Sequence, residues 1–406
     1  MTKIDYAMPL DLVDPTSGMD YYTAGSMLAK LAEVGDPRGI SVGTNTNLVQ
    51  PIPYFENLFP GAAGKPPFNI YGVGAASTAT QVVYDTYLGY HGDYGDALGF
   101  LDESPTLHSK LGQYAYYLNQ FCCYFGARTF GSSDYESFQL HLRKRFSHGL
   151  QFDFNYTFEK SLDTTSDVER STASYCAASG CGNLTTGGVT SVALDSWYPH
   201  KSYSYSDFDV RHNSNANWIY EFPFGKGKRL GANIPGWANQ ILGGWQVSGL
   251  FRLTSGFPFN VLSCGSCFTT NDGLVNNAVL LTPTTELPET KVSKSNGIPD
   301  AFADPTDAVL DFKPGRPGEI GLRNVLRGDG YFTIDTGVGK SFPIGERSRL
   351  QFRWETFNLT NTPKFSTSGL NAEIDEPTTF GQYNQTYATC DQVAGRCMQF
   401  SLRLEF

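Results

Sequence analysis

The residues from 150 to 158 read Leu150-Gln151-Phe152-Asp153-Phe154-Asn155-Tyr156-Thr157-Phe158, with apolar and polar side chains in strict alternation. A β-strand directs successive side chains to opposite faces, so this stretch has one apolar face and one polar face. Its length also falls in the range of about 9–11 residues that a tilted strand needs to cross a bilayer. The stretch therefore predicts a β-strand that crosses a membrane.

The same alternation recurs in six further segments of the chain. It is clearest at the end, where Met398, Phe400, Leu402, Leu404 and Phe406 alternate with polar residues. The other segments are 137–146, 213–222, 245–253, 332–338 and 350–355, with the weakest alternation over 332–338. Together they predict an all-β fold, namely a portion of an antiparallel transmembrane β-barrel. Because so few strands cannot close a barrel around a wide polar lumen, we expect an open, curved sheet.

The connections between these strands separate a membrane barrel from a soluble β-sandwich, which shows the same alternation. Tight turns at 147–149 and 343–348, and a longer connection over 225–240, lie at one end of the expected sheet. The alternate connections, at roughly 161–206, 256–330 and 360–396, are much longer. Short periplasmic turns and long extracellular loops are typical of outer-membrane barrels. The sequence therefore predicts an outer-membrane protein with long extracellular loops.

The chain divides into two parts by the strength of this alternation. Residues 131–406 hold the predicted barrel strands, and they are interpreted as the C-terminal strands of a barrel. In residues 1–130 the alternation is weak, and we expect an extracellular loop region with room for one or two barrel strands, for example at 77–90 or 114–121.

The charge and composition of the chain exclude one class of partner. Forty acidic and thirty basic residues give a net charge of −10, whereas nucleic-acid binding calls for clustered basic surface. No nucleic-acid partner is expected. Aromatic residues make up 14% and charged residues 17% of the chain, a balance that favours an exported β-protein over a cytosolic enzyme.

Eight cysteines occur in four close pairs, which indicates an oxidising compartment. The candidates for disulfide bonds are Cys176, Cys181, Cys264, Cys267, Cys390 and Cys397, whereas the partners of the adjacent Cys122 and Cys123 stay open. The alternative for the Cys264–Cys267 pair is half of a redox or zinc site, but no second cysteine or histidine pair supplies the other ligands. The first residues have no apolar export signal. We therefore expect the chain to be the C-terminal part of a longer precursor.

No pattern of an active site, cofactor site or metal site occurs in the sequence. A nucleophile elbow, a Walker A sequence, a zinc-protease helix and a dinucleotide-binding turn are all missing. The segment Gly225-Lys-Gly-Lys-Arg229 is interpreted as a basic periplasmic turn and not as a phosphate loop. Asp207 and Asp209 could bind Ca²⁺ but lack the ligand spacing of an EF-hand. We expect neither enzymatic activity nor a cofactor.

Several motifs in order resemble a known family over most of residues 5–406. They are Tyr135 to Phe152, Asn155 to Asp163, Asp209-Val-Arg-His-Asn213, Tyr220 to Gly227, Leu242 to Gly249, Arg323-Asn-Val-Leu-Arg-Gly-Asp-Gly330 and Gln351 to Asn361, with Gln50 to Pro60 near the start. These segments resemble the barrel of Oar-like TonB-dependent outer-membrane receptors. The resemblance implies a receptor with a carboxypeptidase-regulatory-like domain, a plug and a 22-stranded barrel, of which this chain would be the C-terminal barrel part. It also implies that TonB acts only through the missing N-terminal plug and its box.

The last strand has a second expected role. Outer-membrane barrels end in alternating apolar residues with a terminal aromatic, which the barrel assembly machinery is thought to recognise as an extended edge. The residues Phe400, Leu402, Leu404 and Phe406 are the candidates for this assembly signal. The same side chains are expected to contact outer-membrane lipid.

The function hypothesis that these observations favour is the C-terminal barrel fragment of a TonB-dependent receptor or transporter, for uptake or surface binding of an unidentified ligand. Two alternatives stay open. One is a passive outer-membrane surface or adhesion protein whose long, disulfide-bearing loops bind a partner. The other is a secreted, soluble, β-rich glycan-binding protein, in which the aromatic side chains would be ligand platforms.

Overall fold

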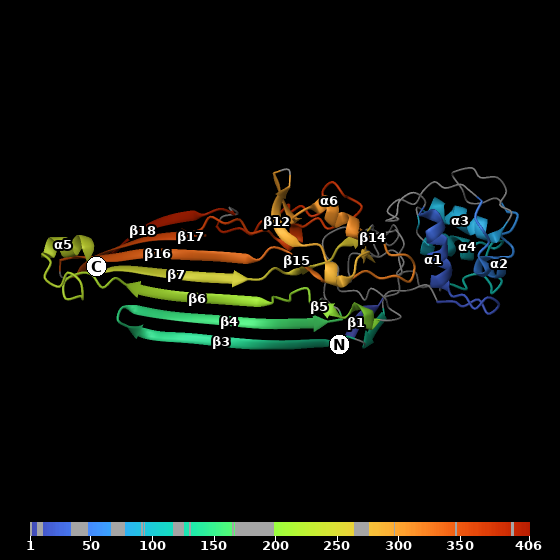
Figure 1. The fold of residues 1–406 in the computed structure, drawn as a ribbon. Coiled ribbons are helices and arrows are strands. Elements are labelled where there is room, and N and C mark those ends of the chain that lie inside the picture. The colour runs from blue at the N-terminus through green and yellow to red at the C-terminus, as the bar shows by residue number, and fades with distance from the viewer. Residues whose placement is uncertain are drawn as a thin grey trace.

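A long antiparallel sheet forms the body of the protein (Figure 1). The computed structural model describes residues 2–5, 11–33, 48–65, 78–90, 92, 94–116, 126–129, 131–164, 166, 199–263, 276–295, 297–345, 347–390 and 394–406. The sheet runs in the order β18-β17-β16-β7-β6-β4-β3, and the short strand β5 pairs with β4. Its strands are β3 (Ser133–Ser147), β4 (Leu150–Asp163), β5 (Ser204–Tyr205), β6 (His212–Glu221), β7 (Trp245–Thr254), β16 (Tyr331–Ile344), β17 (Ser348–Phe357) and β18 (Cys397–Glu405).

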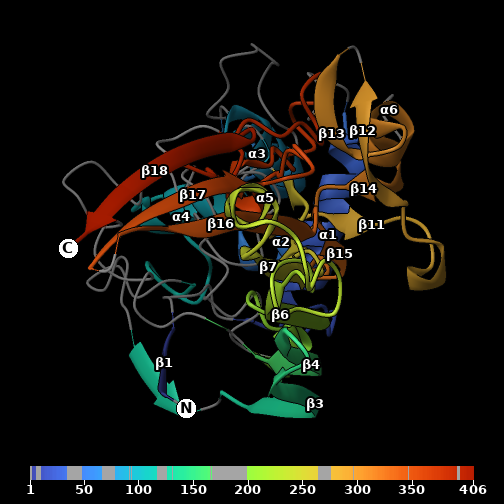
Figure 2. The same cartoon turned by 90° about the vertical axis from the view of Figure 1, so that its left-hand side faces the viewer.

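All seven predicted strands are present, and each is at least nine residues long. Each pairs antiparallel with the strand next to it in the sheet. Figure 2 shows that the sheet curves from β18 to β3 and does not close. The expected fold class, an open and curved antiparallel β-barrel portion, is therefore confirmed.

The cross-strand register places the predicted apolar side chains on one face of the sheet. Trp245 pairs with Lys340, and Lys340 pairs with Phe352, so these three side chains form one row. Trp354 pairs with Phe400, and the two rings stack with their centroids 5.9 Å apart. Residues that pair across a ladder point to the same side, and a slip of one residue would reverse every side chain. The opposite face is polar and includes the ion pair of Arg143 with Asp153.

Tight turns join the strands at one end of the sheet, which we call the tight-turn end. Between β3 and β4 the chain reverses at His148 and Gly149, which have φ angles of 53° and 79°. A side chain at Gly149 would also approach the carbonyl oxygen of Glu221 to 2.8 Å. The connection from β6 to β7 is longer and includes the short helix α5 (Gly236–Leu242), which lies at the same end as the C-terminus (Figure 1).

The opposite end of the sheet carries a folded unit, which we call the loop-side region (residues 256–263, 276–330 and 358–390, as far as they are described). The sequence predicts loops here, but these residues contain a buried core that includes Phe302, Phe312, Ile374 and Phe380. Four two-stranded ladders surround it: β8–β15, β9–β10, β11–β14 and β12–β13. The elements are β8 (Pro258–Phe259), β9 (Leu262–Ser263), β10 (Asn276–Asn277), β11 (Val279–Leu280), η3 (Thr284–Glu286), β12 (Thr290–Ser295), β13 (Ile298–Phe302), α6 (Pro305–Ala308), η4 (Val309–Asp311), β14 (Phe312–Lys313), β15 (Leu326–Arg327) and η5 (Thr367–Gly369), while η2 (Pro199–Ser202) precedes β5.

A helical unit lies beyond the loop-side region, at the end remote from α5 (Figure 1). It consists of α1 (Tyr21–Ala32), α2 (Pro53–Leu58), α3 (Ala79–Gly89) and α4 (Tyr94–Glu103). Its core is a group of fully buried aromatic side chains that includes Tyr21, Tyr54, Phe55, Tyr94 and Tyr116. Among the residues that the structure describes, no helix has the length and apolar character needed to span a membrane.

The helical unit corrects one expectation about residues 1–130. The segment 77–90, named as a place for a barrel strand, instead forms α3. The hydroxyl of Thr78 accepts a hydrogen bond from the Gln81 amide and so begins this helix. The β-branched and aromatic residues of α3 are buried on nearly all sides of the helix. The packing of these side chains in the core outweighs their intrinsic preference for strands. The other named segment, 114–121, lies mostly outside the described residues, and two short strands, β1 (Thr2–Asp5) and β2 (Gly126–Thr129), pair with each other.

An ion pair joins the helical unit to the loop-side region. The guanidinium of Arg316 donates from Nε to Glu33 Oε1 and from Nη2 to Glu33 Oε2, both at 2.6 Å. Both side chains are mostly buried, and the parallel geometry is the strong, two-bonded form of this contact. The helical unit is therefore docked on the loops and away from the tight-turn end.

Candidate binding site in the loop-side region

The site begins with a buried arginine that fixes the loop-side region to the ends of the strands. The side chain of Arg323 is only 2% exposed, and its Nη1 lies 2.7 Å from Asp163 Oδ1 at the end of β4. Its Nη2 donates to Asp207 Oδ1 at 3.0 Å and to Ser166 Oγ at 2.6 Å. A buried charge is tolerated when ionic and hydrogen-bonding partners compensate for lost water. Here two carboxylates and a hydroxyl bind the two terminal nitrogens, whereas the buried Nε has no hydrogen-bond partner within the described ranges.

A second arginine of the same sequence motif, Arg327, fixes the adjacent segment. We call Arg323 and Arg327, with their acidic partners, the rim of the site. Arg327 forms an ion pair with the buried carboxylate of Asp209 and donates to the carbonyl oxygens of Asp209 and Gly256. Its guanidinium lies 5.1 Å from the ring centroid of Tyr205, and the guanidinium of Arg211 lies 5.3 Å from the same centroid. The ring of Tyr205 thus has two cation–π contacts. The two sequence motifs that contain Arg211 and Arg327 meet at this ring.

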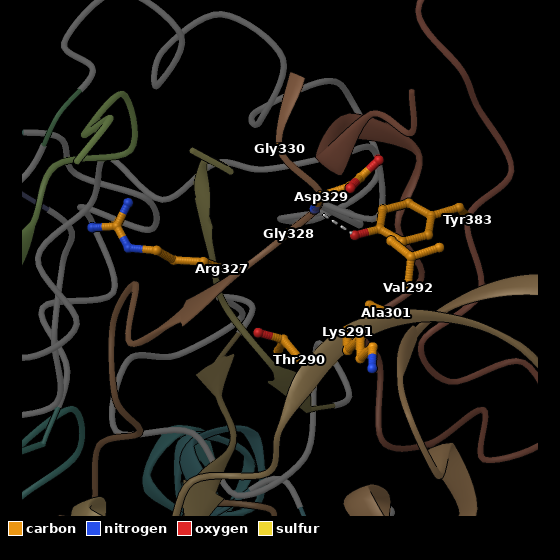
Figure 3. A pocket seen from close by; sticks show the side chains of 9 residues that line it. All are labelled: Thr290, Lys291, Val292, Ala301, Arg327, Gly328, Asp329, Gly330 and Tyr383. Atoms are coloured by element: carbon orange, nitrogen blue, oxygen red, sulfur yellow. Dashed lines mark hydrogen bonds between the residues drawn. The ribbon is translucent and has the colours of Figure 1, made fainter. Parts of the chain in front are cut away.

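A pocket of about 340 Å³ lies next to these contacts, and Arg327 is one of the residues that line it (Figure 3). Residues of β12, β13 and the segment before β16 surround it, together with Tyr383 from the last long loop. The lining residues are Thr290, Lys291, Val292, Ala301, Arg327, Gly328, Asp329, Gly330 and Tyr383. The volume lies at the lower end of the range of about 300–1,000 Å³ that is usual for small-molecule sites.

Gly328 of the Arg-Gly-Asp-Gly segment and Gly256, which lies against it, are needed for the close packing of the pocket wall. A side-chain carbon at Gly328 would lie 2.2 Å from Thr367 Cγ2, and one at Gly256 would lie 1.8 Å from the Gly328 carbonyl oxygen. Neither position can therefore take a larger residue without a shift of the backbone. The tight contact places Asp329 against Tyr383.

Asp329 and Tyr383 form the polar wall of the pocket, and in Figure 3 the Tyr383 hydroxyl points toward the backbone nitrogen of Asp329. The Tyr383 hydroxyl accepts a hydrogen bond from the Asp329 amide at 2.9 Å, so its own hydrogen can be donated to a ligand. The Asp329 carboxylate accepts from the Phe365 amide at 3.1 Å. Across the pocket, Thr290 adds a hydroxyl and the exposed Lys291 adds a cation. This set suits a small polar ligand with several hydroxyl groups.

Burial shifts the acid–base properties of this wall. It raises the pKa of the Tyr383 hydroxyl to about 12, so the phenol is neutral and can act as a donor at neutral pH. It also raises the pKa of the Asp329 carboxyl above its usual value. Loss of solvent penalises the charged form of both groups.

The candidate assembly signal lies far from this pocket, on the edge strand β18. The side chains of Phe400, Leu402, Leu404 and Phe406 are exposed. Phe400 and Leu402 pair with Trp354 and Phe352 of β17. The four residues therefore extend the apolar face to the edge of the sheet. Their recognition by the assembly machinery stays a prediction.

One of the candidate disulfides lies within the described residues. Cys390 and Cys397 are bonded, with their Cα atoms 6.7 Å apart, and the bond ties the last long loop to the start of β18. The candidates Cys176, Cys181, Cys264 and Cys267, together with Cys122 and Cys123, lie outside the described residues. Within the part of the chain that the structure describes, no cluster of three or more His, Cys, Asp or Glu could hold a metal ion. Asp207 and Asp209, considered above for Ca²⁺, bind the two rim arginines instead.

Local sequence patterns do not predict the pocket, because its walls come from distant parts of the chain. Residues 323–330 are distinctive in the sequence only for their resemblance to Oar-like receptors. The signal it carries is two arginines followed by Gly-Asp-Gly just before a strand, together with the acidic residues Asp207 and Asp209 near the preceding strands. That pattern indicates a rim held by ion pairs, but it does not show the contribution of Tyr383.

Comparison with known proteins gives one match. The model of the family described as "Outer membrane beta barrel domain" matches residues 83–399, which include the loop-side region and nearly all of the long strands. Neither the curated proteins nor the solved structures contain a match to this chain.

Proposed function

The chain belongs to the outer membrane beta barrel domain family, and from this premise we propose that it forms the C-terminal barrel part of a TonB-dependent receptor that binds a small polar ligand. Membership of the family places the protein in the outer membrane, as a β-barrel protein. The secreted, soluble alternative is not kept, because it disagrees with this location. The TonB-dependent activity and the Oar-like assignment are the proposed part.

The observation that carries the proposal is the pocket next to the rim. Part of its wall is made by residues 327–330, which belong to one of the segments that resemble Oar-like receptors. A membrane wall alone does not need a rim of buried ion pairs and a defined pocket on the side of the long loops. A receptor does, because a bound ligand must meet preorganised polar groups. In this reading the pocket faces the outside, and the tight turns face the periplasm.

The transport step would depend on a plug and a TonB box. In the family that the chain resembles, TonB pulls on a box ahead of the plug, and the barrel supplies the outer binding surface. The polar face of the sheet, with ion pairs such as Arg143 with Asp153, would then line the lumen around the plug.

The alternative of a passive surface protein keeps one supporting observation. The helical unit is held on the loop-side region by the two hydrogen bonds between Arg316 and Glu33, and so forms a second folded body on the proposed outer surface. A folded outer body of this kind suits adhesion to a partner as well as capture of a ligand.

An uptake experiment separates the two proposals. Cells with and without the gene, each in a parental and a TonB-deficient background, are supplied with a mixture of oligosaccharides and siderophores, and depletion from the medium is followed by mass spectrometry. A compound whose depletion requires both the gene and TonB supports the receptor. If no compound depends on both, the receptor proposal is wrong and the surface-protein proposal remains. A Tyr383→Phe variant, which lacks one donor in the pocket, should reduce depletion, whereas Tyr387→Phe on the same loop should not.

A further inference from the structure

The connection between β6 and β7, residues 222–244, differs in charge from the rest of the chain. It contains three cations, Lys226, Lys228 and Arg229, and no acidic residue, although the whole chain carries a net charge of −10. All three cations are exposed, and Lys228 lies 3.1 Å from Glu221 at the end of β6. The connection is therefore a local basic surface at the tight-turn end.

The same connection exposes large apolar side chains on α5. Trp237 is 72% exposed and Ile241 is 61% exposed, and residues four apart on a helix lie on the same face. Ala238, between them in sequence, is buried against the protein. Leu230 and Leu242 are also exposed. Apolar surface of this kind beside cations is the composition of an interfacial helix.

The connection is folded, so these side chains have a fixed place. The Asn239 side chain accepts a hydrogen bond from the Lys226 amide at 2.7 Å, which fastens α5 to the basic turn. The Gly225 amide donates to the Leu230 carbonyl oxygen, and the Leu230 amide donates to the Pro223 carbonyl oxygen, both at 2.9 Å. The basic residues and the helix thus form one unit.

The end of α5 lies over the apolar face of the sheet. The carbonyl oxygen of Ile241 accepts hydrogen bonds from Trp245 Nε1 and from Lys340 Nζ, each at 2.9 Å. Trp245 and Lys340 are paired residues of the apolar face, as the register shows. The apolar surface of α5 is therefore continuous with the face that contacts lipid in a membrane barrel.

The buried ammonium of Lys340 needs a polar partner, and the Ile241 carbonyl oxygen of α5 supplies it. Lys340 lies in an apolar row and is only 6% exposed, with its ammonium 5.2 Å from the ring centroid of Trp245 and 5.0 Å from that of Phe342. A charge on the lipid side of a barrel is costly without a partner. The last turn of a helix offers free carbonyl oxygens with partial negative charge, and α5 supplies one to this ammonium.

We propose that residues 222–244 form an interfacial anchor, in which Trp237 and Ile241 enter the phospholipid leaflet at the tight-turn end and the cations bind lipid phosphates. The apolar surface of α5 continues into the lipid-facing side of the sheet, which favours lipid over a protein as the partner of α5. A protein that covered α5 would also have to displace the lipid beside Trp245 and Lys340. Lys226 and Arg229, together with Lys228 beside Glu221, make a local excess of positive charge that suits anionic headgroups. The anchor rests on the membrane-barrel assignment and is independent of the TonB proposal.

Photo-crosslinking of the full chain in outer membranes tests the anchor. A diazirine amino acid replaces Trp237 or Ile241 in turn, and the control replaces Leu310, which is 50% exposed in the loop-side region. We expect phospholipid adducts at 237 and 241 at least ten times as abundant as those at 310. Adducts to a protein at 237 and 241, or lipid adducts no more frequent than at 310, would overturn the proposal.

A second measurement uses a conservative variant and does not depend on the crosslinker. The wild-type chain and Trp237→Phe are reconstituted in phosphatidylethanolamine and phosphatidylglycerol vesicles, and tryptophan emission is quenched with lipid brominated near the headgroup or with acrylamide in the water. If the anchor is correct, brominated lipid quenches more emission in the wild-type chain than in Trp237→Phe, and acrylamide quenches both equally. An excess of acrylamide quenching in the wild-type chain would place Trp237 in water and contradict the anchor.

Discussion

The substitution Arg323→Met removes the ion that holds the loop-side region to β4. The side chains of Arg323 and Asp163 are 2% and 5% exposed, so the variant leaves a buried carboxylate without its cation. Removal of one partner from a buried ion pair costs about 3–5 kcal/mol. Since about 1.4 kcal/mol is a factor of ten, the equilibrium for local opening should rise by two to three orders of magnitude or more.

Hydrogen exchange measured by mass spectrometry on the protein in nanodiscs is the assay. Peptides over 199–211 and 318–330 should exchange faster in Arg323→Met by roughly this factor, whereas peptides from β17 should be unchanged. The matched control is Arg353→Met, because Arg353 pairs with Glu355 at 2.9 Å but is 60% exposed. An exposed pair contributes only about 0–1 kcal/mol. Equal exchange in the two variants would refute the role given to the buried arginine.

Three further predictions concern other parts of the chain. Burial and two neighbouring glutamates raise the pKa of Asp375 to about 6, so the folded state holds this proton more tightly than the unfolded state. The contribution of Asp375 to the stability of this loop is therefore full below about pH 4 and is lost as the pH rises through 6. Hydrogen exchange should show a weaker pH dependence of loop stability in Asp375→Asn, in which only the raised pKa of Glu373 still contributes. Removal of the disulfide by Cys390→Ser and Cys397→Ser should destabilise the loop by about 2–3 kcal/mol and leave the barrel assembled, so that protease cleaves the loop faster while heat-modifiability on gels is unchanged. Phe406→Asp should reduce insertion much more than a substitution at Glu405, although the lipid-facing cost near the interface is only about 0–1 kcal/mol; equal assembly of both variants would show that the last strand carries no signal.

The long strands could be predicted because their signal lies within each strand. Phe152 or Trp354 shows its face through its immediate neighbours, since one side of the sheet meets lipid and the other meets water. The two ends of the sheet could be told apart from the lengths of the connections between the strands alone. The order of the strands followed because neighbours along the chain pair with each other.

The loop-side region and the helical unit could not be predicted from such local patterns. In α3 nearly every side chain is buried, so the helix has no polar face whose period would reveal it. The pocket joins Thr290, Asp329 and Tyr383, which are far apart in the sequence and meet only after the loops fold. In the sequence Lys340 is a charged residue at an apolar position of its strand, and its partner on α5 appears only in three dimensions.

A nitroxide scan along β17 tests most directly whether the sheet is a membrane wall. The label is attached through a click-reactive amino acid at each position from 350 to 355, in the protein reconstituted in bilayers, and its collisions with oxygen and with a water-soluble nickel chelate are measured. Oxygen accessibility should peak at 350, 352 and 354, and nickel accessibility at 351, 353 and 355, because the two sets face lipid and the polar lumen. If both reagents follow the same phase, or if the two phases are reversed, the apolar face does not contact lipid and the account of this protein as a barrel wall is wrong.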